Sequence, residues 1–106
     1  MAAALVDLAR ELKYWQLMFR LSKNQIRILD SKIDDLEMKM VRYRSNRRHS
    51  GRVQARKQLM CYMGVRHVMY EFCHRALQEC ELQQEKLLSM LDTFPETYQE
   101  IHDIIV

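Results

Sequence analysis

Apolar residues recur through the first 45 positions at alternating steps of three and four. In chain order they are Leu5, Leu8, Leu12, Trp15, Phe19, Ile26, Leu29, Ile33, Leu36, Met40 and Tyr43, with the polar Ser22 at the one remaining position. This spacing continues for about six heptads and is typical of a helix packed along its length against another helix. No glycine or proline interrupts residues 2–45, so the pattern predicts one helix over about 3–45.

A short polar stretch ends this pattern at 46–51. It contains Asn46, Ser50 and Gly51, which favour turns and helix caps, so we expect the turn there. A second apolar pattern then predicts a helix over about 52–91. Its best heptad positions are Leu59, Tyr62, Val65, Met69, Phe72, Ala76, Cys80, Gln83, Leu87 and Met90. Two successive steps of four within this series predict a local break in the heptad register.

The segment from Thr93 to Glu96 predicts the start of a third helix. A threonine followed three residues later by a glutamate is the pattern of a capping box, and Pro95 suits a first helical turn. Apolar residues at 94, 98, 101 and 105 mark one face of a short helix over about 94–105. A helix of this length is marginal alone, so we expect it to dock on the other two.

Composition agrees with an all-α fold. Two glycines and one proline in 106 residues disfavour a turn-rich β fold, and 48% hydrophobic residues disfavour disorder. A short connection makes consecutive helices antiparallel neighbours, so we expect one domain over 1–106, a long two-helix coiled-coil hairpin in which position i faces about position 100 − i. Such a hairpin buries little surface, and we expect oligomerisation to complete it as a helical bundle.

Apolar residues outside the heptad positions indicate where a partner would pack. They lie on both long helices and on the short third helix, which would either close the open end of the hairpin or contact a partner. The candidate oligomer or docking surface consists of Leu17, Leu21, Met60, Met63, Leu77, Leu88, Leu91, Phe94, Tyr98, Ile101 and Ile105.

Charge is segregated along the chain more strongly than the net charge of +3 suggests. Residues 1–37 carry six basic and six acidic side chains, whereas residues 38–70 carry nine basic side chains and no acid. Residues 71–106 carry two basic and eight acidic side chains. Clustered cations of this kind favour an anionic partner, which is an acidic protein segment, nucleic acid or an acidic membrane surface.

We call the cations around the predicted turn the basic tip; they are Arg42, Arg44, Arg47, Arg48, Arg52, Arg56 and Lys57. Ser50 follows two of these arginines at a spacing that basophilic protein kinases recognise, which makes it a candidate phosphorylation site. Phosphate at this position would offset part of the positive charge of the basic tip.

No pattern in the chain indicates catalysis or a cofactor. Phosphate-binding glycine loops and the common hydrolase and metalloprotease motifs are missing from the sequence, so we expect no enzyme and no small-molecule substrate. Cys73 and Cys80 lack the close pairing of zinc ligands, and we interpret them as small residues between the helices. With no long apolar run and no signal-peptide pattern, we expect an intracellular protein, cytoplasmic or nuclear, without a membrane span.

These observations together predict a non-catalytic coiled-coil module that oligomerises and acts as an adaptor in an intracellular complex. The alternative is a module that binds nucleic acid or another polyanion through the basic tip.

Overall fold

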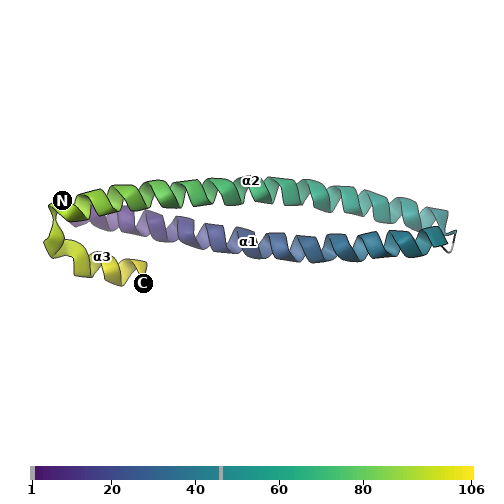
Figure 1. Cartoon of the computed structure of the whole chain (residues 1–106), viewed down its shortest axis with the longest axis horizontal. Coiled ribbons are helices and arrows are strands. Elements are labelled where there is room, and N and C mark those ends of the chain that lie inside the picture. The colour runs from purple at the N-terminus through teal and green to yellow at the C-terminus, as the bar shows by residue number, and fades with distance from the viewer. Residues whose placement is uncertain (1, 46) are drawn as a thin grey trace. The chain divides into compact units, whose positions relative to one another are not determined.

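The chain folds as an all-α hairpin with a short C-terminal helix, as the heptad pattern predicts. The computed structural model describes residues 2–45 and 47–106, in which helix α1 spans Ala2–Ser45 and helix α2 spans His49–Thr93 (Figure 1). A 3₁₀ turn, η1 (Pro95–Thr97), leads into helix α3 (Tyr98–Ile105). No strand occurs in this part of the chain.

The chain divides into two compact units. Unit 1 combines the chain up to residue 21 with residues 73–106, and therefore holds both ends of the hairpin's arms together with α3. Unit 2 consists of residues 22–72 and holds the turn with the flanking parts of α1 and α2. The expectation that 1–106 forms a single domain stays a prediction.

Unit 1 is organised around a core to which all three helices contribute. The buried cluster consists of Leu5, Ala9, Leu12, Leu87, Leu91 and Ile101. Ile101 is 1% exposed and is the buried residue of α3. The short helix therefore docks on the hairpin by inserting this side chain, and burial of the apolar face supplies the stability that eight residues lack alone.

The predicted capping box is wrong. Thr93 is the last residue of α2, and its hydroxyl donates to the carbonyl of Ser89 at 3.5 Å. Thr97 precedes α3 instead, and its hydroxyl donates to the carbonyl of Phe94 at 2.8 Å. The apolar pattern of α2 fades at Leu91, but its backbone continues two residues further, so Thr93 is not free to cap the next helix. Pro95 does lie in the first turn of η1, where its missing N–H costs nothing.

A Schellman motif ends α1 in unit 2. The N–H of Arg48 donates to the carbonyl of Tyr43 at 2.9 Å, and the N–H of Arg47 donates to the carbonyl of Arg44 at 3.4 Å. Arg47 has φ 56°, the left-handed conformation that this motif requires. An arginine thus occupies the position where glycine is most common.

The prediction that Gly51 forms the turn is therefore wrong. Gly51 and Ser50 both belong to α2, which begins at His49, and Asn46 lies outside the described residues. Gly51 instead lets the Tyr43 ring lie close to the backbone of α2, because a Cβ at this position would be only 3.2 Å from Cε1 of that ring. Because two arginines complete the turn, the chain needs fewer connecting residues than the polar stretch 46–51 suggested.

Replacing Arg47 by glycine is expected to raise the free energy of unfolding by about 0.5 to 1 kcal/mol, because glycine adopts a positive φ without steric cost. Arg47→Ala is the matched control, since it removes the same charge but keeps the Cβ. Urea unfolding followed by circular dichroism measures both. Equal stabilisation by the two variants would show that relief of charge repulsion, not backbone conformation, is responsible.

Contacts between side chains of the two long helices define their register. Glu11 pairs with Gln83 in unit 1, while in unit 2 Asp30 pairs with Arg66 and Lys32 lies over the Tyr62 ring. The residue numbers of these pairs sum to about 95, not the expected 100. The difference follows from the turn, which is centred at 47–48 and not near 50.

This register overturns part of the predicted packing of α2. Val65 is 46% exposed and Phe72 is 37% exposed, whereas Arg66 and Cys73 are half-buried in their place. With these two residues, the steps along the inner face of α2 alternate regularly between three and four, so the predicted break in the heptad register is also wrong. The reason is physical. The space between the helices accommodates an arginine that is paired and a small thiol, although arginine and cysteine are less apolar than valine and phenylalanine.

Two polar side chains on α2 are stabilised by partners on α1. Nη1 of Arg66 donates to Oδ1 of Asp30 at 2.9 Å, and this hydrogen bond raises the pKa of the guanidinium. Gln83, which is 5% exposed, donates from Nε2 to Oε1 of Glu11 at 3.2 Å. Its own Oε1 is buried and has no hydrogen-bond partner among residues 2–45 and 47–106.

Candidate interaction surfaces

The middle of α2 is apolar on more than the face that packs on α1. In unit 2, Val65, Val68 and Phe72 form one exposed stripe at helical spacing, and Met60 and Met63 are exposed on another side. A helix that is apolar around much of its circumference is normally buried on all those sides. This part of α2 therefore has apolar surface that the described chain leaves uncovered.

Most residues of the predicted docking surface are exposed, and a few are not. The exposed ones are Leu17, Leu21, Met60, Met63, Leu77, Leu88 and Tyr98. Leu91 and Ile101 instead belong to the core of unit 1, and Phe94 and Ile105 are partly buried against it. Docking of α3 therefore leaves these four side chains less exposed than the other seven.

The stripe of Val65, Val68 and Phe72 was not among the predicted docking residues. The heptad pattern predicts Val65 and Phe72 between the helices, because they are the strongest apolar residues near those heptad positions. Their spacing of i, i+3 and i+7 was a usable signal for a second apolar face. What the sequence does not reveal is which of two neighbouring stripes faces α1.

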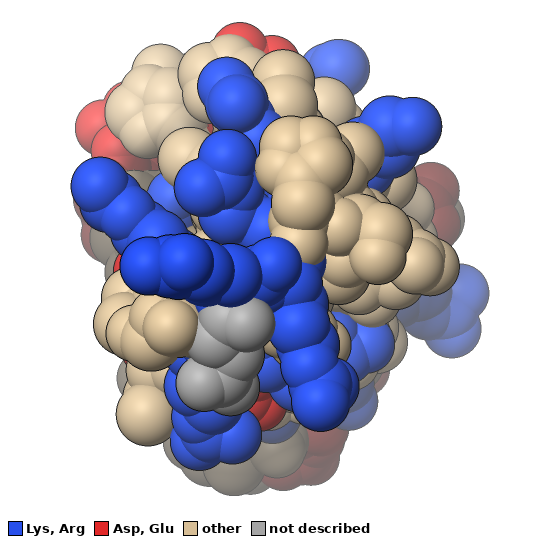
Figure 2. Space-filling model, turned by 90° about the vertical axis from the view of Figure 1, so that its right-hand side faces the viewer, with Lys and Arg blue, Asp and Glu red and all other residues tan. Residues whose placement is uncertain are grey.

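The cations of the basic tip all lie in unit 2, and the side chains of all seven are exposed. Figure 2 faces the turn and shows lysine and arginine side chains covering much of this end. Within residues 2–45 and 47–106, none of the seven takes part in an ion pair. No ion pair in this part of the chain therefore neutralises their positive charge.

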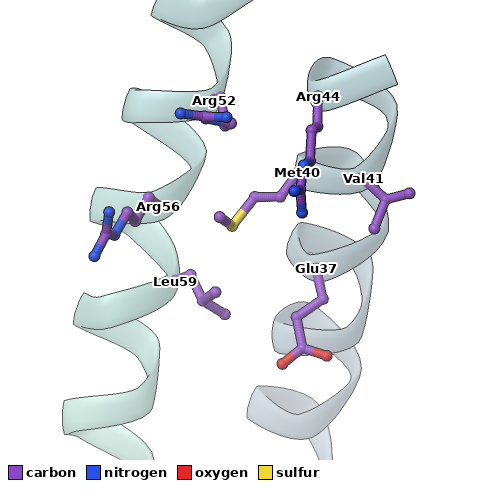
Figure 3. A pocket seen from close by; sticks show the side chains of 7 residues that line it. All are labelled: Glu37, Met40, Val41, Arg44, Arg52, Arg56 and Leu59. Carbon is purple, nitrogen blue, oxygen red and sulfur yellow. The ribbon is translucent and has the colours of Figure 1, made fainter. Parts of the chain in front are cut away.

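A groove of about 400 Å³ lies between α1 and α2 beside the basic tip. We call it the arginine groove; it is lined by Glu37, Met40, Val41, Arg44, Arg52, Arg56 and Leu59. Figure 3 shows Met40 and Leu59 pointing into the space between the helices. The groove thus combines an apolar floor with three arginines.

A smaller hollow of about 250 Å³ lies over the turn itself. Its lining includes Tyr43, His49 and four arginines of the basic tip. Ser50, the candidate phosphorylation site, is exposed in the first turn of α2. A phosphate there would lie close to the positive end of the helix dipole, which favours negative charge. Its modification stays a prediction.

The cysteines show no sign of a reactive or metal-binding arrangement. All three are free, with Cys61 exposed and Cys73 and Cys80 half-buried. Partial burial and the neighbouring Glu81 raise the pKa of the Cys80 thiol, which keeps it protonated and weakly nucleophilic at neutral pH. Over the described part of the chain, no three His, Cys, Asp or Glu side chains gather as a metal site requires.

Comparisons with known proteins add no family. No protein-family model matches the chain, and no curated protein or solved structure does. None of the helices in the described residues combines the length and apolar content that crossing a bilayer requires. The exposed apolar surface and the basic tip are therefore the two features of the molecule that bear on its function.

Proposed function

We propose that this chain is a non-catalytic assembly module, which self-associates through its helices inside the cell and acts as an adaptor for other proteins. The observation that carries the proposal is the uncovered apolar surface of α2 between residues 60 and 72. Because burying apolar surface is the dominant favourable contribution to association, a second set of helices is the partner that this surface fits best.

The exposed area supports the same proposal. The chain exposes 7995 Å² to solvent, whereas a compact monomer of 12.9 kDa is expected to expose about 6300 Å². The excess of about 1700 Å² is about twice the roughly 800 Å² that each partner buries in a standard protein interface. A large contact with a second copy would bring the exposed area toward the usual value.

Analytical ultracentrifugation tests self-association. We expect the wild-type chain to associate at micromolar concentration, and Val68→Gln with Phe72→Gln to weaken that association by at least about tenfold, since a tenfold change corresponds to about 1.4 kcal/mol. Both side chains are exposed in the single chain, so the substitutions leave the monomer folded. Met38→Gln is the control, because Met38 is 59% exposed but lies on α1, away from this stripe.

A wild-type chain that remains a folded monomer at micromolar concentration would contradict self-association. An equal effect of Met38→Gln would show that general hydrophobicity, not this stripe, drives the association.

The unpaired cations of the basic tip favour a second candidate function, which is binding of nucleic acid or another polyanion. Phosphate contacts by lysine and arginine supply most of non-specific nucleic-acid affinity and weaken steeply with salt. Charge reversal within the basic tip separates this function from docking of an acidic protein, as described next.

A further inference from the structure

The arginine groove differs from the rest of the basic tip because it has an apolar floor. Met40 and Leu59 are half-buried and come from opposite helices, and Val41 is 65% exposed at the side of the groove. Figure 3 shows the side chains of Met40 and Leu59 directed toward one another. Such a floor accommodates an apolar side chain and excludes water from it.

Positive and negative charges are distributed unevenly along the groove. In Figure 3 the Arg52 side chain lies above Met40, at the end nearer the turn, and the Arg44 side chain extends down to the level of Met40. Glu37 lies below them. Arg56 adds a third exposed cation on α2. Within the described residues, none of these three arginines forms an ion pair. A ligand is therefore attracted most strongly if its negative charge points toward the turn.

We propose that the arginine groove binds a short acidic amphipathic segment of a partner protein. An apolar side chain of the segment packs on Met40 and Leu59, and its carboxylates pair with Arg44 and Arg52. Arginine forms bidentate hydrogen bonds with carboxylates, so these pairs add orientation as well as attraction. This inference rests on the proposed adaptor function, for which it names the chemistry of the partner.

An acidic peptide fits the groove better than nucleic acid does. A phosphodiester backbone presents no apolar side chain, so the floor of the groove would contribute nothing to its binding. Its affinity would depend on the number of nearby cations, and those outside the groove would count as much as those inside. Arg42 and Lys57 belong to the basic tip but do not line the groove, which makes them a matched control.

Fluorescence anisotropy with three labelled probes tests the proposal on the full chain. The first probe is a helical peptide with two leucines one turn apart on one face and glutamates on the flanks. The second replaces both leucines by serine at the same charge, and the third is a DNA duplex. The protein variants are Arg44→Glu with Arg52→Glu, and the control pair Arg42→Glu with Lys57→Glu, each checked for helicity by circular dichroism.

We expect the leucine peptide to bind the wild-type chain at least about tenfold more tightly than the serine peptide, because only the former fills the apolar floor. The groove variant should lose at least about tenfold in affinity for the leucine peptide, and the control variant less than about threefold. Sedimentation of the groove variant should match that of the wild type. Loss of self-association therefore tests the assembly module, and loss of peptide binding tests the groove.

Equal losses in the two variants, together with equal affinity for the leucine and serine peptides, would overturn the proposal in favour of general charge attraction. Binding of the DNA duplex more tightly than the leucine peptide would overturn it in favour of nucleic acid. Salt-sensitive self-association that disappears in the groove variant would identify a second copy of this chain as the occupant, and would also overturn it.

Discussion

Replacing Ile101 by alanine is expected to lower the free energy of unfolding by about 2 to 4 kcal/mol and to release α3 from the hairpin. Ile101 is 1% exposed and lies in the same buried cluster as Leu5 and Leu12. Removing its side chain leaves a cavity where three helices meet. Because α3 has only eight residues, its stability depends on its contacts with this core, and Ile101 is the most deeply buried of the α3 residues that make them.

Urea unfolding and limited proteolysis measure the two effects of Ile101→Ala. The free energy of unfolding should fall, and cleavage beyond Thr93 should accelerate under native conditions. Tyr98→Ala is the matched control on the same helix, because Tyr98 is 58% exposed and should change stability by less than about 1 kcal/mol. If both variants behave alike, α3 is not held by the core of unit 1.

Replacing Gln83 by leucine is expected to raise the free energy of unfolding by about 1 to 3 kcal/mol. The Oε1 atom of Gln83 is buried without a hydrogen-bond partner, and such an atom carries an uncompensated desolvation cost. Leucine has a similar size and removes that cost. The variant also loses the hydrogen bond to Glu11, but Glu11 is exposed and can be hydrated by water.

Gln78→Leu is the control for this substitution, because Gln78 lies on the same helix and is exposed. Its effect on stability should lie within about 0.5 kcal/mol. Both variants are compared by urea unfolding at the same protein concentration, since self-association would raise apparent stability. A destabilised Gln83→Leu variant would show that the bond to Glu11 outweighs the unpaired oxygen.

The long helices could be predicted because the signal is repeated many times. On α1, every apolar heptad position strengthens the same interpretation, and no glycine or proline competes with it. The inner face is accordingly buried at Ile26, Ile33 and Leu36. The short connection between two such patterns then leaves the antiparallel hairpin as the simplest arrangement.

Single positions could not be predicted, because they depend on contacts between distant residues. Arg66 lies between the helices because Asp30 is available on α1, and no local pattern reveals that pairing. Arg47 adopts the left-handed turn although Gly51 is the better residue for it, because the register places Gly51 against Tyr43. Local preference is a weak constraint where packing of a whole helix decides the register.

The candidate surfaces were predictable to different degrees. The basic tip follows from the positions of charged residues alone, because cations near a turn are exposed in almost any hairpin. The arginine groove does not: Met40 and Leu59 are predicted between the helices as heptad positions, but no pattern predicts that an open groove remains there beside three arginines. The division of α3 into a buried face and an exposed Tyr98 likewise depends on how the helix docks.

The register of the hairpin also has a consequence for the order of folding. Tyr43 and Gly51 approach each other across the turn, whereas the Asp30–Arg66 contact spans 36 residues and the Glu11–Gln83 contact spans 72. The entropy lost in closing a loop grows with its length, by about 0.6 kcal/mol per doubling, so contacts beside the turn form first. Substitutions at Arg47 should therefore change mainly the folding rate, and substitutions at Gln83 mainly the unfolding rate.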